Sequence, residues 1–117
     1  MAFKFEKLIV WQKAVDLSDT VYKLTKSFPI EEVYALTSQI RKAANAVSLN
    51  IAEGSAGPSN REFNRFLGVA LRSDMEIVGC IYLAQRRGYI KEDEFKKIYE
   101  ACGELLVMIN ALKKRLK

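Results

Sequence analysis

Apolar residues recur at intervals of three and four along four stretches of this chain, a spacing that places them on one face of a helix. The stretches cover about residues 8–27, 31–53, 60–87 and 91–115. None of them alternates apolar and polar residues for long enough to predict a strand. The sequence therefore predicts an all-α fold with four helices.

The breaks between the stretches are short. Phe28-Pro29 ends the first helix, because proline disfavours helical geometry in the residue before it. Gly54 is expected to stop the second helix, and Ser59 or Asn60 to cap the third. Short connections favour antiparallel neighbours, so we expect an up-down-up-down four-helix bundle. At 117 residues the chain fits one domain, which we assign to residues 1–117.

The ends of the second, third and fourth helices carry further signals. Glu31 and Glu32 are expected in the first turn of the second helix, where the helix dipole favours acidic residues. Arg86 and Arg87 precede Gly88 where the third helix should end, with the cations and then the glycine that a helix C-terminus prefers. No apolar run reaches the roughly 20 residues of a membrane span, so no membrane partner is expected.

Residues that usually carry catalysis are missing. The chain has no histidine, which is the commonest general base and metal ligand. It also lacks a Cys-x-x-Cys pair and a glycine-rich phosphate loop. Acid-base work by Glu53, Asp74 or Glu76 lacks a paired nucleophile. We therefore expect no enzyme, no metal, no cofactor and no small-molecule substrate.

Two cysteines and one aspartate lie in the apolar patterns. Cys80 and Cys102 are expected to pack as reduced thiols, which suits a cytoplasmic protein. Asp74 lies near the apolar face of the third helix, and a buried carboxylate needs a partner. Arg41, Asn50 or a tyrosine hydroxyl from a neighbouring helix could supply it.

Positive charge gathers at the C-terminus and on one face of the third helix. The net charge is +5, and four of these charges come from Lys113, Lys114, Arg115 and Lys117. The other 15 of the 19 basic residues nearly balance the 14 acidic ones. On a helical wheel of about 100° per residue, an arc of about 60° opposite the apolar stripe holds four arginines, namely Arg61, Arg65, Arg72 and Arg86.

This row predicts phosphate binding, because arginine suits bidentate phosphate contact and Gly68 and Gly79 in the same arc would let a backbone approach. An ordinary solvated helix face explains the row equally well. Cations in a last helical turn likewise stabilise the helix dipole whatever else they do. We expect no exposed aromatic platform for bases, with Trp11 and the phenylalanines in core stripes, so binding would be independent of sequence.

The second helix has an outer face with little charge. Between Val33 and Ala52 only Arg41 and Lys42 are charged. A helix exposed to water usually has a charged outer face, so this face predicts a homo-oligomer. An alanine-rich helix with high intrinsic propensity is the alternative. The predicted contact residues are Ser38, Asn45, Ala46, Leu49 and Ala52.

Several segments in the same order resemble a known family. They include the segment 39–54 (QIRKAANAVSLNIAEG), with 8–14 (LIVWQKA), Phe28-Pro29, 61–67 (REFNRFL) and 88–90 (GYI). The chain resembles the four helix bundle protein family, the 23S rRNA intervening-sequence proteins, whose reading frames were first noticed within bacterial large-subunit rRNA genes. The family's structural signature corresponds to Asn50, Glu53, Gly54, Ser73 and Glu76.

The resemblance implies a ring-like homopentamer without established enzymatic activity. The family is similar in fold to the accessory proteins of diversity-generating retroelements, which are basic pentamers that bind nucleic acid. The signature implies a helix end and a polar contact between helices. Ser48 replaces a common proline, Arg72 a common glycine and Asp74 a common apolar residue, so helix packing can differ here.

Together these observations predict a non-catalytic, oligomeric protein that binds RNA or DNA through basic surface residues. An interaction scaffold without a nucleic-acid role is the alternative. A third hypothesis, an enzyme that uses Asp74 or Glu76, would need a concave site.

Overall fold

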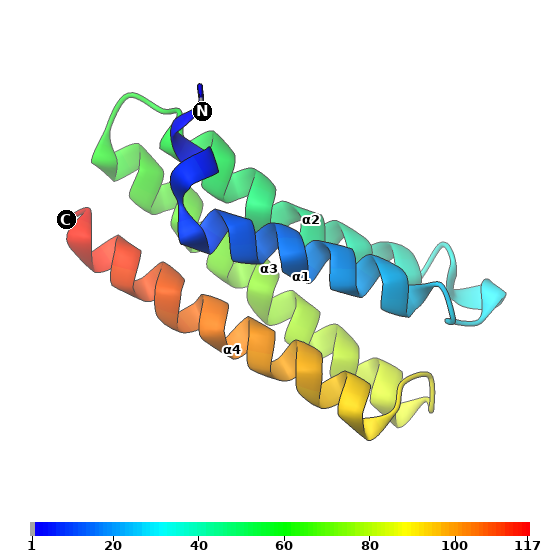
Figure 1. Cartoon of the computed structure of the whole chain (residues 1–117). Coiled ribbons are helices and arrows are strands. Elements are labelled where there is room, and N and C mark those ends of the chain that lie inside the picture. Colours follow the sequence, from blue (N-terminus) through cyan, green and yellow to red (C-terminus); the bar gives the residue numbers. More distant parts are fainter. Residues whose placement is uncertain (1) are drawn as a thin grey trace.

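A computed structural model describes residues 2–117 of the protein, and it contains four α-helices (Figure 1). No β-strand occurs among the described residues. Two 3₁₀ turns, η1 and η2, precede α1 and α2. The all-α prediction is therefore confirmed. The elements are η1 (Lys4–Lys7), α1 (Ile9–Thr25), η2 (Ile30–Glu32), α2 (Leu36–Ser55), α3 (Asn60–Arg86) and α4 (Glu92–Arg115).

The helices pack into an elongated bundle of 43 × 22 × 22 Å. α2 packs against α1 and α3, and α4 packs against α3 and α1. The two chain termini and the α2–α3 connection lie at one end, and the other two connections lie at the opposite end (Figure 1). None of the helices in the described chain is long and apolar enough to cross a membrane.

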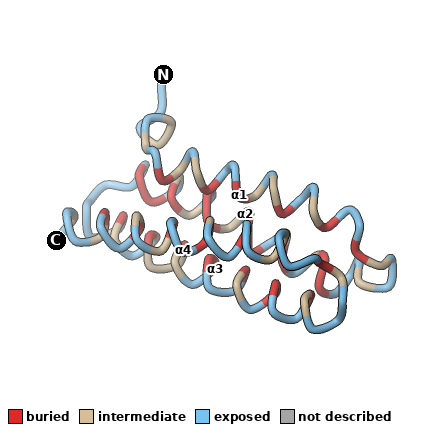
Figure 2. Tube along the Cα trace, turned by 60° about the horizontal axis from the view of Figure 1, so that its bottom comes forward, coloured by how far each residue is buried: buried red, intermediate tan, exposed pale blue. Residues whose placement is uncertain are grey.

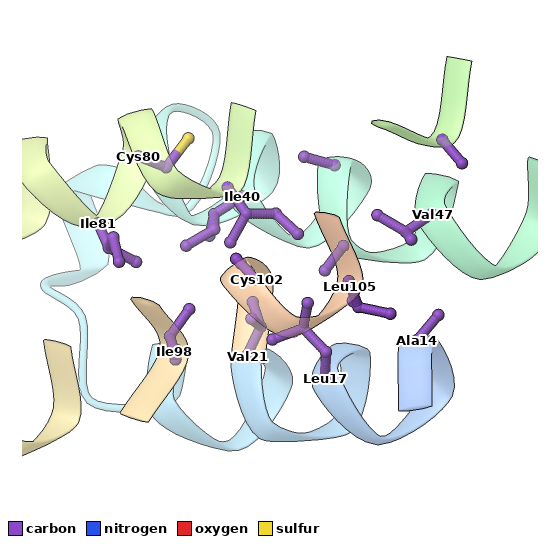
Figure 3. Packing of buried hydrophobic residues seen from close by; sticks show 14 of the residues in the cluster. Ala14, Leu17, Val21, Ile40, Val47, Cys80, Ile81, Ile98, Cys102 and Leu105 are labelled. Atoms are coloured by element: carbon purple, nitrogen blue, oxygen red, sulfur yellow. The ribbon is translucent and has the colours of Figure 1, made fainter. Parts of the chain in front are cut away.

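The four apolar stripes meet in one core. Residues that face the bundle axis are buried along every helix, and the outward residues are exposed (Figure 2). Leu17 of α1, Ile40 of α2 and Leu105 of α4 point into the same interior (Figure 3). Burying one such side chain stabilises the fold by about 1.5–3 kcal/mol. Cys80 and Cys102 are free and buried in this core, which confirms their predicted state.

The predicted start of the second helix is wrong. Glu31 and Glu32 both lie in η2, and α2 begins only at Leu36. The Glu32 carboxylate instead accepts hydrogen bonds from Tyr89 Oη at 2.8 Å and from the Leu36 backbone N–H at 3.2 Å. The bond from Tyr89 is the main cause that lowers the pKa of Glu32. Glu32 thus joins the α1–α2 connection to the α3–α4 connection.

Gly54 does not stop α2, which runs on to Ser55. The glycine is buried, and a Cβ there would lie 2.6 Å from Phe66 Cβ and 3.0 Å from Phe63 Cδ1. Its physical role is therefore close packing of α2 on α3. The other predicted helix ends agree with the structure within about two residues, which is the usual uncertainty of a boundary.

The predicted caps of α3 are both present. Ser59 Oγ accepts a hydrogen bond from the Glu62 backbone N–H at 3.1 Å. At the other end Gly88 has a φ of 78°, a conformation that glycine adopts without strain. The Gly88 N–H donates to the Gln85 carbonyl at 3.0 Å, which satisfies a carbonyl at the helix end.

Candidate nucleic-acid interface

The four predicted arginines of α3 are all exposed. Arg65 Nη2 donates a hydrogen bond to Glu62 Oε1 at 2.8 Å, and this interaction lowers the pKa of Glu62. The Arg65 guanidinium also lies over the Phe66 ring, 4.6 Å from its centroid. None of the acids in residues 2–117 forms an ion pair with Arg61, Arg72 or Arg86. Three of the four charges are thus available for an anion.

A hollow of about 780 Å³ lies between the start of α3 and the end of α4. Three cations line it, and they come from two distant parts of the sequence: Arg61 and Arg65 from α3, and Lys117 from the C-terminus. The remaining lining residues are Ser59, Glu62, Asn64 and Leu116. Glu62 offsets the charge of Arg65, so the hollow combines the positive charge of Arg61 and Lys117 with amide and hydroxyl groups, which suits a phosphate ligand.

Lys113 holds the end of α4 on α3. Its Nζ donates hydrogen bonds to Asn64 Oδ1 at 2.7 Å and to the Asn64 carbonyl at 3.0 Å. Asn64 Nδ2 in turn donates to the Lys113 carbonyl at 2.8 Å. Lys113 is partly buried, so it is a structural link beside the hollow rather than a freely exposed cation.

The other predicted cations do not join this hollow. Arg115 lines a separate depression of about 260 Å³, which lies between the start of α1 and the end of α4. Lys7, Ile9 and Met108 also line it. Lys114 is exposed. Arg86 lies about 38 Å from Arg61 along α3, at a rise of about 1.5 Å per residue. The structure therefore gathers only Arg61, Arg65 and Lys117 from the predicted set around one site.

An exposed aromatic surface was missed by the sequence analysis. Tyr82 of α3 and Tyr99 of α4 are 53% and 48% exposed, and Phe95 lies between them. The Tyr82 and Phe95 ring centroids are 5.0 Å apart, and those of Phe95 and Tyr99 are 5.8 Å apart. The expectation that no aromatic platform is exposed is therefore wrong. The sequence does contain a signal for this exposure. Tyr82 lies four residues before Arg86 and therefore on the helix face that was predicted to lie opposite the apolar stripe.

The residues of the family signature have local roles. Asn50 Nδ2 donates to the Ala46 carbonyl within α2 at 2.8 Å, and among residues 2–117 its side chain forms no hydrogen bond to another helix. Glu76 Oε2 accepts a hydrogen bond from Gln39 Nε2 at 3.3 Å, which links α3 to α2. Glu53 is exposed and Ser73 half-buried.

Asp74 is fully buried, and neither of its carboxylate oxygens has a hydrogen-bond partner in the described chain. Burial raises the pKa of Asp74 to about 6, and the neighbouring Cys102 thiol partly opposes this rise. The predicted partners are wrong: Arg41 bonds Thr25 Oγ1 at 2.7 Å, and Asn50 bonds its own helix. Asp74 lines none of the hollows described above, so it is not placed to act on a substrate there.

The outer face of α2 is open to solvent. Leu49 is 58% exposed, and Ser38, Ala46 and Ala52 are half-buried. Asn45 is exposed and accepts a hydrogen bond from Ser18 Oγ of α1. The face is thus apolar with little charge, and its role as an oligomer contact stays a prediction.

Known proteins share the fold and the sequence pattern. The crystal structure of a protein of unknown function from the S23 ribosomal protein family of Bacteroides thetaiotaomicron VPI-5482 is similar, with a TM-score of 0.81. Its sequence is 20% identical, and the likeness covers 91% of this chain and 99% of that chain, which shows the fold alone. No curated protein matches the chain. The pattern of the 23S rRNA-intervening sequence protein family matches residues 6–111, and the chain therefore belongs to this family.

Proposed function

We propose that this protein binds RNA through phosphate contacts around the hollow between the start of α3 and the end of α4. The observation that carries the proposal is the meeting of Arg61, Arg65 and Lys117 around this hollow. Arginine and lysine side chains that surround a depression attract phosphate and contribute binding that is independent of sequence. The description of the family, which names 23S rRNA, agrees with an RNA ligand.

The binding role is non-catalytic in this proposal. Among residues 2–117 no three His, Cys, Asp or Glu side chains come together in a group that could hold a metal ion. Asp74 lies beside the Cys102 thiol, but both groups are fully buried, and burial raises the pKa of that thiol. The exposed Glu76 carboxylate accepts a hydrogen bond from the Gln39 amide, which is not a nucleophile. We assign the protein to the cytoplasm, where RNA and reduced cysteines coexist.

The proposed assembly is a ring-like homo-oligomer, a pentamer by resemblance, of antiparallel up-down-up-down bundles. The positions of the termini and connections support the antiparallel order (Figure 1). The exposed Leu49 and its small neighbours on α2 support a contact between copies, because an exposed apolar face normally needs a partner. A ring would repeat the cationic hollow and raise the affinity for a long RNA through multivalency.

A protein-interaction scaffold is the second candidate function. Ile30, the first residue of η2, and Tyr34, two residues after its end, are 85% and 96% exposed at one end of the bundle. Large apolar side chains at this exposure favour contact with another protein. If the protein is such a scaffold, the residues around the hollow should contribute no affinity for RNA.

Binding of the purified protein to a labelled RNA across a salt series from about 50 to 200 mM separates the two candidates. The proposal predicts tight binding at low salt that weakens steeply, since each phosphate contact adds about 0.7–0.9 to the slope of log affinity against log salt. Absence of binding at the lowest salt concentration would reject the proposal and favour the scaffold.

A further inference from the structure

Tyr82 lies on the same helix as the arginine row, and Phe95 of α4 joins its ring to that of Tyr99. Tyr82 shares a helix face with Arg86, four residues later, and with Gly79, three residues earlier. Tyr99 lies likewise four residues before Gly103 on α4. A Cβ at Gly79 or Gly103 would meet no atom within 4 Å, so the helix backbones beside the rings are open to solvent. We call Tyr82, Phe95 and Tyr99 the aromatic patch.

The aromatic patch and the cationic hollow lie on one continuous face. At a rise of about 1.5 Å per residue, Tyr82 lies about 32 Å along α3 from Arg61, with Arg72 between them. Arg72 is exposed and has no ion-pair partner among the described acids. Of the acids near this face, Glu62 pairs with Arg65 and Glu100 with Lys96. Glu76 and Glu92 accept hydrogen bonds from neutral amides, which carry no compensating charge. Arg72 thus supplies positive charge between the hollow and the rings, and Arg86 supplies it beyond Tyr82.

We infer that the α3–α4 face binds single-stranded nucleic acid, with bases stacked on Tyr82 and Tyr99 and phosphates on the arginine row. Aromatic side chains can stack only on bases whose faces are free, and a duplex hides those faces. Cations along the path of the backbone, with aromatic rings beside it, are the combination that single-strand binding proteins use. This inference rests on the proposed function and specifies its ligand, because phosphate contacts alone would accept a duplex equally.

The geometry also sets the length of the strand. The distance of about 32 Å between the hollow and the aromatic patch corresponds to about nine nucleotides at the stacked spacing of about 3.4 Å per nucleotide. A strand of about 12 nucleotides would therefore reach both ends of the face, whereas one of about four would reach only one end. Affinity should rise steeply between these lengths.

The test compares a 12-nucleotide single strand, as RNA and as DNA, with the duplex of the same sequence, by fluorescence anisotropy at fixed salt. The variants are Tyr82→Leu/Tyr99→Leu and a matched control, Tyr22→Leu/Tyr34→Leu, which removes two exposed tyrosines of α1 and the α1–α2 connection. We expect the first variant to bind either single strand about tenfold more weakly or worse, the scale of one lost stacking contact. This variant should bind the duplex with wild-type affinity. The control variant should bind both the single strands and the duplex with wild-type affinity. Tyr82→Phe/Tyr99→Phe keeps the rings and should retain wild-type affinity.

The possible failures are distinguishable. Equal affinity of the wild type for single strand and duplex, or equal loss in both leucine variants, overturns the single-strand inference and leaves the phosphate proposal intact. Absence of binding to every nucleic acid at low salt rejects the proposed function itself. A change in mass of Tyr82→Leu/Tyr99→Leu by light scattering, with nucleic-acid affinity unchanged, identifies the face as a contact between copies and also overturns the inference.

Discussion

The Asp74 carboxylate lies beside the Cys102 thiol in the core between α3 and α4, and no hydrogen-bond partner in the described chain satisfies either of its oxygens. Burial raises the pKa of Asp74 to about 6 from an ordinary value of 3.8. It raises the pKa of the Cys102 thiol as well, and the nearby Asp74 charge adds to that rise. The core between α3 and α4 therefore contains a carboxyl group, Asp74, whose protonated form is favoured by burial.

The first prediction concerns stability and pH. The folded state binds the Asp74 proton more tightly than the unfolded state, so this group's contribution is most favourable below about pH 4. That contribution is lost as the pH rises through about 6, at a total cost of about 2–3 kcal/mol at pH 7. Asp74→Asn should therefore gain stability relative to the wild type between pH 4 and pH 7. Urea unfolding of both proteins at several pH values measures this gain, and Asp19→Asn, which changes an exposed residue, is the control. A stability difference between Asp74→Asn and the wild type that stays constant between pH 4 and pH 7 would contradict the account.

The second prediction concerns Gly54. Gly54→Ala places a methyl group 2.6 Å from Phe66 Cβ, so α2 and α3 must separate. We expect a loss of about 1–3 kcal/mol in the free energy of unfolding, the usual effect of overpacking. Gly103→Ala is the matched control, since it meets no atom within 4 Å and should stabilise α4 by about 0.5–1 kcal/mol. Equal stability of the two variants would argue against close packing at Gly54.

The third prediction concerns the link between Asn64 and Lys113. Asn64→Leu removes two side-chain interactions and leaves a partly buried ammonium group with fewer partners. We expect a loss of about 1–2 kcal/mol and faster amide hydrogen exchange in the last turns of α4. Asn110→Leu, an exposed position on α4, should change stability by less than about 0.5 kcal/mol. Unchanged exchange at the end of α4 in Asn64→Leu would show that the link does not hold the helix.

The fourth prediction concerns assembly. Leu49→Lys puts a charge in the middle of the exposed face of α2, where it would have to be desolvated in a contact between copies. The mass measured by light scattering should fall toward that of a monomer, 13.3 kDa. Val107→Lys, at an exposed apolar position on α4, should leave the mass unchanged. Identical masses for both variants and the wild type would show that the exposed face of α2 is not a contact between copies.

Local signals predicted much of the fold. Periodicity identified four helices, and Ser59 and Gly88 bounded α3, because these features depend on residues within one turn. The delayed start of α2 could not be predicted in the same way. It depends on Glu32, whose partner Tyr89 belongs to a different connection at the same end of the bundle.

The candidate site was predicted only in part, for a similar reason. A helical wheel places Arg61 and Arg65 on one face, but only the register of α4 against α3 brings Lys117 to them and ties Lys113 to Asn64. The same register places Phe95 of α4 against Tyr82 of α3. Contacts between helices set these groupings, and no pattern within one helix contains them.

The most direct measurement is the salt dependence of RNA binding by two double variants that remove equal charge. Arg61→Ala/Lys117→Ala alters the hollow, whereas Lys23→Ala/Lys97→Ala alters a depression between α1 and α4 on another face. The account predicts that the slope of log affinity against log salt becomes shallower by about 1.4 in the first variant, about 0.7 for each lost contact with a single strand. The second variant should keep the wild-type slope. Equal slopes for both variants would contradict the claim that the hollow binds phosphate.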